Sequence, residues 1–210
     1  ASRAWPLWPV PNLDLTPHGQ ELASKLGHYY RLFYAPKLGF DSIESETCPS
    51  EDWLVAVPDN VERDVKTAEG FISGMFPSCE VDLKLWTGSG QDPIFHPTKS
   101  IATYSGDAFK AAVLARIGSL QSLQADLSSL LAVTQSILEC CKPAACDHGT
   151  CTLETLPSGF KPGGLIYGTL NVGPNAVETW LMEYAQGMPT SDVGWGDVDL
   201  STILEVLPIY

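Results

Sequence analysis

The sequence has little positive charge and no long apolar run. Its 210 residues contain 12 Lys and Arg against 25 Asp and Glu, a formal net charge of −13, and no group of basic residues longer than a pair. Nucleic acids and anionic membrane surfaces are bound through clustered Lys and Arg, so we expect neither as a partner. The longest apolar stretch also falls short of the roughly 20 residues that a membrane-spanning helix needs.

The composition is that of a folded globular protein. Hydrophobic residues make up 44% of the chain, whereas disordered chains combine low hydrophobicity with high net charge. The sequence therefore holds enough apolar material for a sizeable core.

The six cysteines include no Cys-x-x-Cys pair, the spacing typical of zinc sites. Disulfides are the expected use, and they indicate an oxidising compartment, the periplasm or the extracellular medium. Cys48 precedes an expected strand and Cys79 follows an expected helix, so a strand–helix return would bring them together. The other four cysteines cluster around His148: Cys140, Cys141, Cys146 and Cys151. A structural bridge is expected there, and a metal ion bound with His148 is the alternative.

Residues 1 to about 90 alternate helix and strand. Thr16 and Pro17 form a helix start, and the apolar face that follows consists of Leu22, Leu26, Tyr29, Tyr30 and Phe33. The apolar run 53–57, closed by Pro58, predicts a strand buried on both faces. Alternation of apolar and polar residues over 80–86 predicts a strand with one polar face.

The second half of the chain changes to a helical pattern. Apolar spacing over 106–138 fits two helices joined near Gly118. A further helix is expected over 174–184 with Asn175 in a capping position, and a short last helix from Ser201.

The segment after Pro58 predicts an amphipathic helix. Asp59 or Asn60 can cap it, and its apolar stripe consists of Val61, Val65, Ala68, Ile72 and Met75. Arg63 lies off that stripe, in the first turn. A guanidinium there, at the carboxyl end of a strand, lies beside unpaired backbone N–H groups and the positive helix end, which attract phosphate. The alternative is a solvated surface Arg that pairs with Glu62 or Asp59.

Several separated segments resemble a known family when they are taken together. They are 4–10 (AWPLWPV), 15–22 with 26–30, 62–63 with 66–71, 92–97 (DPIFHP), and 185–189 (AQGMP) with 194–196. In this order they resemble the histidine acid phosphatases, most closely the bacterial phytases. The helix that carries Arg63 is similar to the second helix of that family, whose matching Arg binds the scissile phosphate.

The resemblance implies a fold class and a set of binding residues. The implied fold is α/β, with part of the phosphatase sheet layer in residues 1–90 and a mostly helical domain in residues 91–210. Arg63 is implied to bind phosphate, and Glu178 is aligned with a carboxylate at the substrate pocket, with Asn175 beside it. From the local pattern alone, Glu178 would stabilise the helix dipole and Asn175 would cap the helix.

The resemblance also bears on the cysteines. It supports a bridge between Cys48 and Cys79, and it maps Cys146 and Cys151 onto a small disulfide-closed loop. It implies neither a cofactor nor a metal ion.

Two motifs of the family are absent from the sequence. The Arg-His-Gly-x-Arg-x-Pro motif with the nucleophilic His and the His-Asp pair with the general acid do not occur, and no function in catalysis is assigned to His18, His28, His96 or His148. In this reaction an imidazole attacks phosphorus, giving a phosphohistidine, and a carboxylic acid protonates the departing alkoxide.

The resemblance therefore implies an internal segment of a phytase-like acid phosphatase, inactive as these residues alone and monomeric at full length. Its substrate would be a small anionic phosphomonoester, phytate or a sugar phosphate. The alternative is a non-catalytic phosphate-binding or interaction protein.

Overall fold

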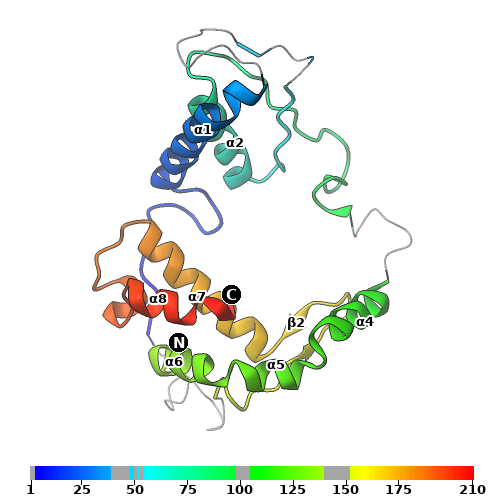
Figure 1. Cartoon of the computed structure of the whole chain (residues 1–210), viewed down its shortest axis with the longest axis vertical. Helices are drawn as coiled ribbons and strands as arrows, with labels where there is room; N and C mark the ends of the chain where they lie inside the picture. Colours follow the sequence, from blue (N-terminus) through cyan, green and yellow to red (C-terminus); the bar gives the residue numbers. More distant parts are fainter. Residues whose placement is uncertain (1–2, 39–47, 50–51, 53, 98–104, 140–151) are drawn as a thin grey trace. The chain divides into compact units, whose positions relative to one another are not determined.

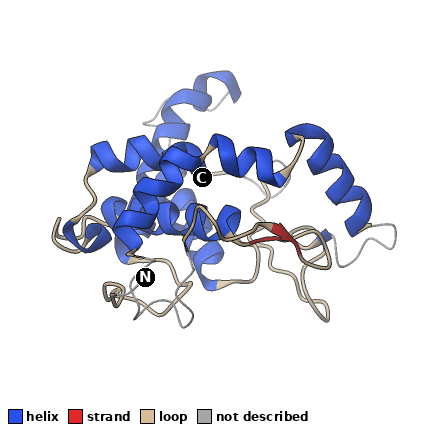
Figure 2. Cartoon of the chain, turned by 90° about the horizontal axis from the view of Figure 1, so that it is seen from below, coloured by secondary structure: helices blue, strands red, loops and turns tan. Residues whose placement is uncertain are grey.

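The computed structural model describes residues 3–38, 48–49, 52, 54–97, 105–139 and 152–210. It divides into two compact units, residues 8–102 and residues 1–7 with 103–210. Figure 1 labels the α-helices and β2, and Figure 2 shows that helices dominate the described residues, with short strands in red. None of the described helices has the length and apolarity that crossing a bilayer requires.

The unit of residues 8–102 contains two packed helices, α1 (Pro17–Leu38) and α2 (Glu62–Met75). As predicted, α1 begins at Pro17, and the Thr16 hydroxyl oxygen accepts a hydrogen bond from the Gly19 N–H at 3.0 Å. The buried Arg31 of α1 donates to the carbonyl oxygen of Met75, at the end of α2, at 2.8 Å. A cation is favourable at this end of a helix, because the last carbonyl groups have no partner within the helix.

The two helices meet through their smallest residues. Three glycines stand where a Cβ atom would collide with backbone of the other helix: Gly27 against Phe71, Gly70 against Gln20, and Gly74 against Ser24. Because glycine has no Cβ, it permits this close approach of two backbones.

The apolar face predicted for α1 is not the face that this helix buries. On α1 the predicted face is exposed: Leu22, Leu26, Tyr29, Tyr30 and Phe33. The residues that α1 buries are Ala23, Gly27, Arg31 and Ala35. On α2 the fully buried residues are Gly70 and Gly74, and the residues of the predicted stripe from Val65 to Met75 are half-buried. Apolar spacing identifies an apolar face, but the helices come together where small side chains allow the shortest separation.

In the described residues of this unit, the strands predicted over 53–57 and 80–86 are not formed, and a single backbone bridge joins the two segments. Ala56 and Leu83 form an isolated parallel bridge, with the Lys84 N–H donating to the Ala56 carbonyl oxygen at 2.8 Å. The expectation of a strand buried on both faces is wrong, since Val55 is 60% exposed. No other described strand lies beside this bridge to cover it. The expected disulfide between Cys48 and Cys79 is present.

The other unit is mainly helical. Its elements are α4 (Gly106–Ile117), α5 (Leu120–Asp126), α6 (Ser128–Leu138), β1 (Gly159–Phe160), β2 (Ile166–Tyr167), α7 (Thr169–Ala185), η1 (Val193–Gly196), α8 (Leu200–Val206) and η2 (Leu207–Ile209). The predicted break at Gly118 is confirmed, but a second break at Leu127 divides the following helix into α5 and α6. The short last helix was also predicted correctly. β1 and β2 pair antiparallel, Gly159 with Tyr167.

Helix α7 begins earlier than predicted. Pro174 and Asn175 lie inside it, because the helix starts at Thr169. Hydrogen bonds of two buried residues fix that start: the Thr169 hydroxyl donates to the Leu156 carbonyl oxygen at 2.8 Å, and the Ser158 hydroxyl oxygen accepts from the Leu170 N–H at 3.0 Å. A capping role for Asn175 is therefore excluded.

The core of this unit surrounds α7. Trp180 and Val177 are completely buried there, together with residues of α6, η1 and α8. The cluster consists of Leu131, Ile137, Leu138, Leu153, Ala176, Val177, Trp180, Val193, Val198, Ile203, Val206 and Ile209. Burial of these large apolar side chains stabilises the unit.

Candidate functional site

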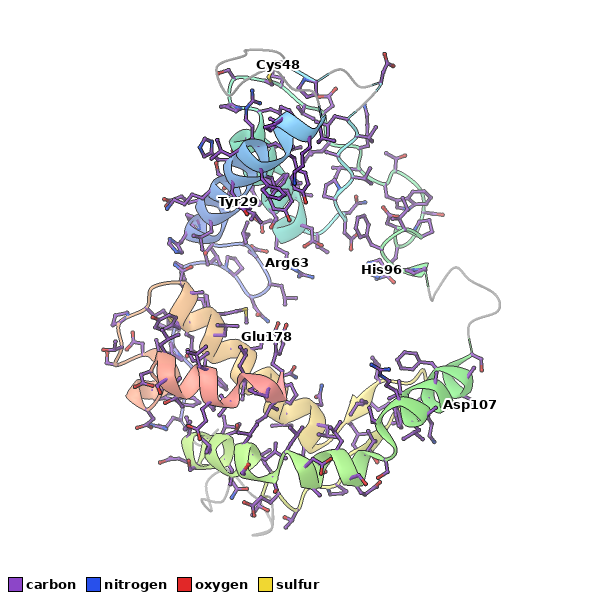
Figure 3. The ribbon with its side chains drawn as sticks, in the orientation of Figure 1. Tyr29, Cys48, Arg63, His96, Asp107 and Glu178 are labelled. Atoms are coloured by element: carbon purple, nitrogen blue, oxygen red, sulfur yellow. A yellow bond between two sulfur atoms is a disulfide. The ribbon has the colours of Figure 1, made fainter. Side chains whose placement is uncertain are left out.

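Arg63 is the second residue of α2 and lies at its N-terminal end, as the sequence predicts (Figure 3). Its side chain is 46% exposed, and its Nε atom lies 3.6 Å from Oδ1 of Asp64. Glu62 and Asp59 were the partners expected for a surface Arg, but Glu62 instead accepts a hydrogen bond from the Leu15 N–H at 2.8 Å. Arg63 thus has an accessible guanidinium with a neighbouring carboxylate.

The start of α2 has no side-chain cap. The N-cap residue is Val61, whose side chain accepts no hydrogen bond, so the predicted capping by Asp59 or Asn60 is wrong. The first N–H groups of α2 therefore have no side-chain acceptor from the N-cap residue, a feature that favours anions. Two carboxylates in the same turn, Glu62 and Asp64, oppose that preference.

Asp59 and Asn60 instead fix the backbone that leads into α2. One carboxylate oxygen of Asp59 lies 3.0 Å from Nε2 of His96, and the other accepts from the Asn60 N–H at 2.7 Å. The Asn60 side chain donates to the carbonyl oxygen of Trp86 at 2.8 Å and accepts from the Trp86 N–H at 3.2 Å. Through these contacts, His96 and Trp86 fix the backbone of residues 59–60, just before the helix that carries Arg63.

Lys66, one turn after Arg63, is paired within its own helix. Its Nζ atom lies 2.7 Å from Oε2 of Glu69, and this hydrogen bond raises the pKa of Lys66. The pair is solvent-exposed, so it adds little to stability.

Glu178 and Asn175 belong to α7, in the other unit. Glu178 lies in the third turn of α7 and its Oε1 atom accepts a hydrogen bond from the Tyr210 hydroxyl at 3.2 Å. This contact raises the pKa of Tyr210. Because a helix dipole acts within the first turn, it does not account for Glu178. Asn175 is exposed, and its carbonyl oxygen accepts from the Thr179 hydroxyl at 2.8 Å.

The structure does not test the bridge or metal site expected in the cysteine cluster around His148. Cys140, Cys141, Cys146, His148 and Cys151 lie outside the described residues. Within the described ranges, no group of three or more His, Cys, Asp or Glu is arranged to hold a metal ion.

Known proteins resemble the chain along almost its whole length. It is 31% identical over 209 residues to phytase AppA of Escherichia coli, covering 93% of this chain and 47% of the relative. It is 28% identical over 210 residues to glucose-1-phosphatase of Salmonella typhimurium, covering 97% of this chain and 49% of the relative. The solved Hafnia alvei phytase in complex with myo-inositol hexakis sulphate matches with a TM-score of 0.85 and 28% identity, over 99% of this chain and 52% of its own. No protein-family model matches the chain.

The chain is a homologue of the histidine acid phosphatases. It spans about half the length of the curated relatives that it matches. At the family level these relatives are phosphomonoester hydrolases. This histidine acid phosphatase homologue has the fold of the matched half of a phytase, and its described part is mainly helical with one two-stranded sheet.

Sequence reasoning missed two contacts of this homologue. It did not identify Asp64 as the partner of Arg63, although adjacency in sequence was a usable signal. It did not connect Asp59 with His96, which lies 37 residues away, and no local pattern indicates such a contact.

Proposed function

We propose that these residues form part of a phytase-like acid phosphatase that hydrolyses small phosphomonoesters, inositol phosphates in particular. The observation that carries this proposal is the homology to phytase AppA and glucose-1-phosphatase over nearly the whole chain. The matching Hafnia alvei phytase was solved with myo-inositol hexakis sulphate, which supports a small anionic ligand. The proposed protein is monomeric and periplasmic or secreted, and its α/β sheet layer includes residues 1–90.

In this proposal Arg63 binds the phosphate group. Its side chain is accessible, and it lies in the uncapped first turn of α2. The exposed contact with Asp64, at 3.6 Å, is worth only about 0 to 1 kcal/mol. A charge-assisted hydrogen bond from Arg to phosphate is stronger than such a contact, so a phosphate displaces Asp64.

Glu178 and Asn175 contribute to the substrate pocket in this proposal. Both side chains come from α7. Carboxylate and amide groups accept hydrogen bonds from the hydroxyl groups of an inositol or sugar ring. Glu178 would exchange its contact with Tyr210 for such a hydroxyl.

The chemical step requires the nucleophilic His and the general acid of two family motifs that do not occur in the sequence. An imidazole nitrogen attacks phosphorus, the phosphorus–oxygen bond to the alcohol breaks, and a carboxylic acid gives its proton to the departing oxygen. Water then hydrolyses the phosphohistidine. We therefore propose that the 210 residues alone are inactive and contribute phosphate affinity and specificity.

The net charge of −13 opposes a polyanionic substrate at long range. At physiological salt, screening limits that repulsion to roughly 8 Å, so the local arrangement of Arg and Lys decides binding. An acidic medium also reduces the repulsion, because it protonates carboxylates.

The experiment is a comparison of Arg63→Ala with the unchanged protein, both made from the complete gene, in an aryl phosphatase assay near pH 5. Loss of one charge-assisted contact in the transition state should lower kcat/KM by about 30- to 1,000-fold, equivalent to about 2 to 4 kcal/mol. Arg116→Ala is the matched control, because it removes one exposed Arg from the last turn of α4.

Two results would count against the proposal. Absence of phosphatase activity in the unchanged protein would favour the non-catalytic phosphate-binding or interaction protein. An unchanged kcat/KM in Arg63→Ala would show that Arg63 does not bind the phosphate group.

A further inference from the structure

Glu183 is a fully buried carboxyl group on α7. Its Oε2 atom accepts a hydrogen bond from the Gly194 N–H at 2.9 Å. Its Oε1 atom is also buried and has no hydrogen-bond partner among the described residues. An ionised carboxylate in such a place is costly, because one backbone N–H does not replace the hydration that burial removes.

The charges around Glu183 do not compensate its own. No ion pair joins it to a Lys, Arg or His of the described residues, and Asp192 is the charged group that acts on it. The other acidic groups of the neighbouring segments are engaged elsewhere: Asp197 with Arg3, Asp199 with Thr202, and Glu178 with Tyr210. Burial, with Asp192, raises the pKa of Glu183, although the Gly194 N–H acts in the opposite direction.

The turn that Glu183 holds has an unfavourable backbone. Gly194 and Trp195 follow one another in the left-handed region, with φ of 52° and 61°. A bulky residue in that region is strained and stays there only when its surroundings fix it. The hydrogen bond from Gly194 to Glu183 is one contact that fixes this turn.

Trp195 in turn holds the segment of residues 3–5. Its indole N–H donates to the Ala4 carbonyl oxygen at 2.6 Å, and its ring centroid lies 4.5 Å from that of Trp5. The Arg3 guanidinium carbon lies 4.7 Å from the Trp195 ring centroid. Arg3 also donates to the Ile137 carbonyl oxygen at 2.9 Å.

We propose that Glu183 is a pH-sensitive latch, which in its protonated form holds the 193–196 turn and the segment of residues 3–5 in place, and on ionisation loosens both. The direction of this pH dependence follows from the coupling between proton binding and folding. The folded state favours the protonated carboxyl, so the stability from Glu183 is fully present below its unfolded pKa. That stability is lost as the pH rises from the unfolded pKa through the raised folded pKa.

The test is amide hydrogen exchange of the chain between pH 4.5 and pH 7.5, corrected for intrinsic exchange rates and read by mass spectrometry. A peptide covering 189–199, where the N–H groups of Asp192, Gly194 and Trp195 donate hydrogen bonds, should lose protection as the pH rises, by about tenfold for each unit by which folding raises the pKa. A peptide covering 174–181, in the core around Trp180, should keep its protection.

Two variants isolate the carboxyl group. Glu183→Gln keeps an acceptor for the Gly194 N–H but cannot ionise, so the pH dependence of the 189–199 peptide should disappear. Glu205→Gln removes the same charge from an exposed position on α8 and should leave the pH dependence unchanged.

The latch is wrong if protection of the 189–199 peptide in the unchanged chain is the same at both pH values, a result that needs no variant. It is also wrong if Glu183→Gln retains the full pH dependence. Neither outcome depends on phosphatase activity, so this inference and the proposed function can fail separately.

Discussion

The two units bring their helices together in opposite ways. Between α1 and α2 the closest contacts are made by glycine against backbone, and the aromatic side chains of α1 remain exposed. Around α7 the contacts are made by large side chains, with Trp180 completely buried. One unit depends on how closely two backbones approach, and the other on how much apolar surface is buried.

This difference predicts opposite responses to a change of side-chain size. In the core around Trp180, removing volume leaves a cavity and loses apolar burial. At the α1–α2 contact, adding a single methyl group forces two backbones apart. The unit of residues 8–102 has additional support from the Cys48–Cys79 disulfide and from Arg31 at the end of α2.

Trp180→Ala should have the largest effect on stability. Trp180 lies at the centre of the buried cluster, and truncation of a buried aromatic residue costs about 3 to 5 kcal/mol. Urea unfolding measures the loss as a lower midpoint. Leu204→Ala, at a residue of α8 that is 60% exposed, should change stability by less than about 0.5 kcal/mol. Equal losses in the two variants would contradict the assignment of the core to α7.

Gly74→Ala should have the next largest effect. The new Cβ would overlap the backbone carbonyl of Ser24, and overpacking of this kind costs about 1 to 3 kcal/mol. The higher helix propensity of Ala offsets about 1 kcal/mol of it.

Thr67→Ala places the same residue on the exposed side of α2 and serves as the control for Gly74→Ala. Its effect should be neutral to slightly stabilising, by less than about 0.7 kcal/mol, because Ala has the higher helix propensity and the lost hydroxyl bonds only within its own helix, to the Arg63 carbonyl oxygen. If Gly74→Ala is as stable as Thr67→Ala, the helices do not approach as closely as described.

Apart from the Cys48–Cys79 disulfide, which joins residues 31 positions apart, the expectations that succeeded depended on neighbours in sequence. Thr16 before Pro17 gave the start of α1, and Gly118 gave the break after α4. The position of Arg63 at the start of a helix was predicted in the same way. Each of these signals acts over one turn of chain, so the local sequence contains it.

The expectations that failed depended on which residues meet in space. The exposed face of α1 is as apolar as a core face, and only the packing of α2 against Gly27 distinguishes the two. Pro174 has the sequence signal of a helix start, but α7 begins earlier, at the buried Thr169, whose hydroxyl donates to the Leu156 carbonyl oxygen. At the candidate site the same limit applies to the contact of Asp59 with His96.

The smallest effect on stability is expected at the start of α8. This helix has a side-chain cap, and α2 has none. The Asp199 carboxylate accepts hydrogen bonds from the Thr202 N–H at 2.8 Å and the Thr202 hydroxyl at 2.9 Å, whereas Val61 offers α2 no side-chain acceptor. These hydrogen bonds lower the pKa of Asp199. Its contribution to stability is therefore present above the unfolded pKa, near 4, and is lost as the pH falls through the lowered folded value.

Asp199→Ala should consequently be slightly less stable than the unchanged chain at pH 7, and the difference should shrink toward pH 2. Asp199→Ser, which keeps a capping oxygen without a charge, should recover most of the loss at pH 7 and show a weaker pH dependence. Urea midpoints at the two pH values measure both differences. A difference between Asp199→Ala and the unchanged chain that is the same at both pH values would mean that the charge of Asp199 does not contribute. Because Glu183 acts in the opposite pH direction, the double variant with Glu183→Gln separates the two carboxyl groups.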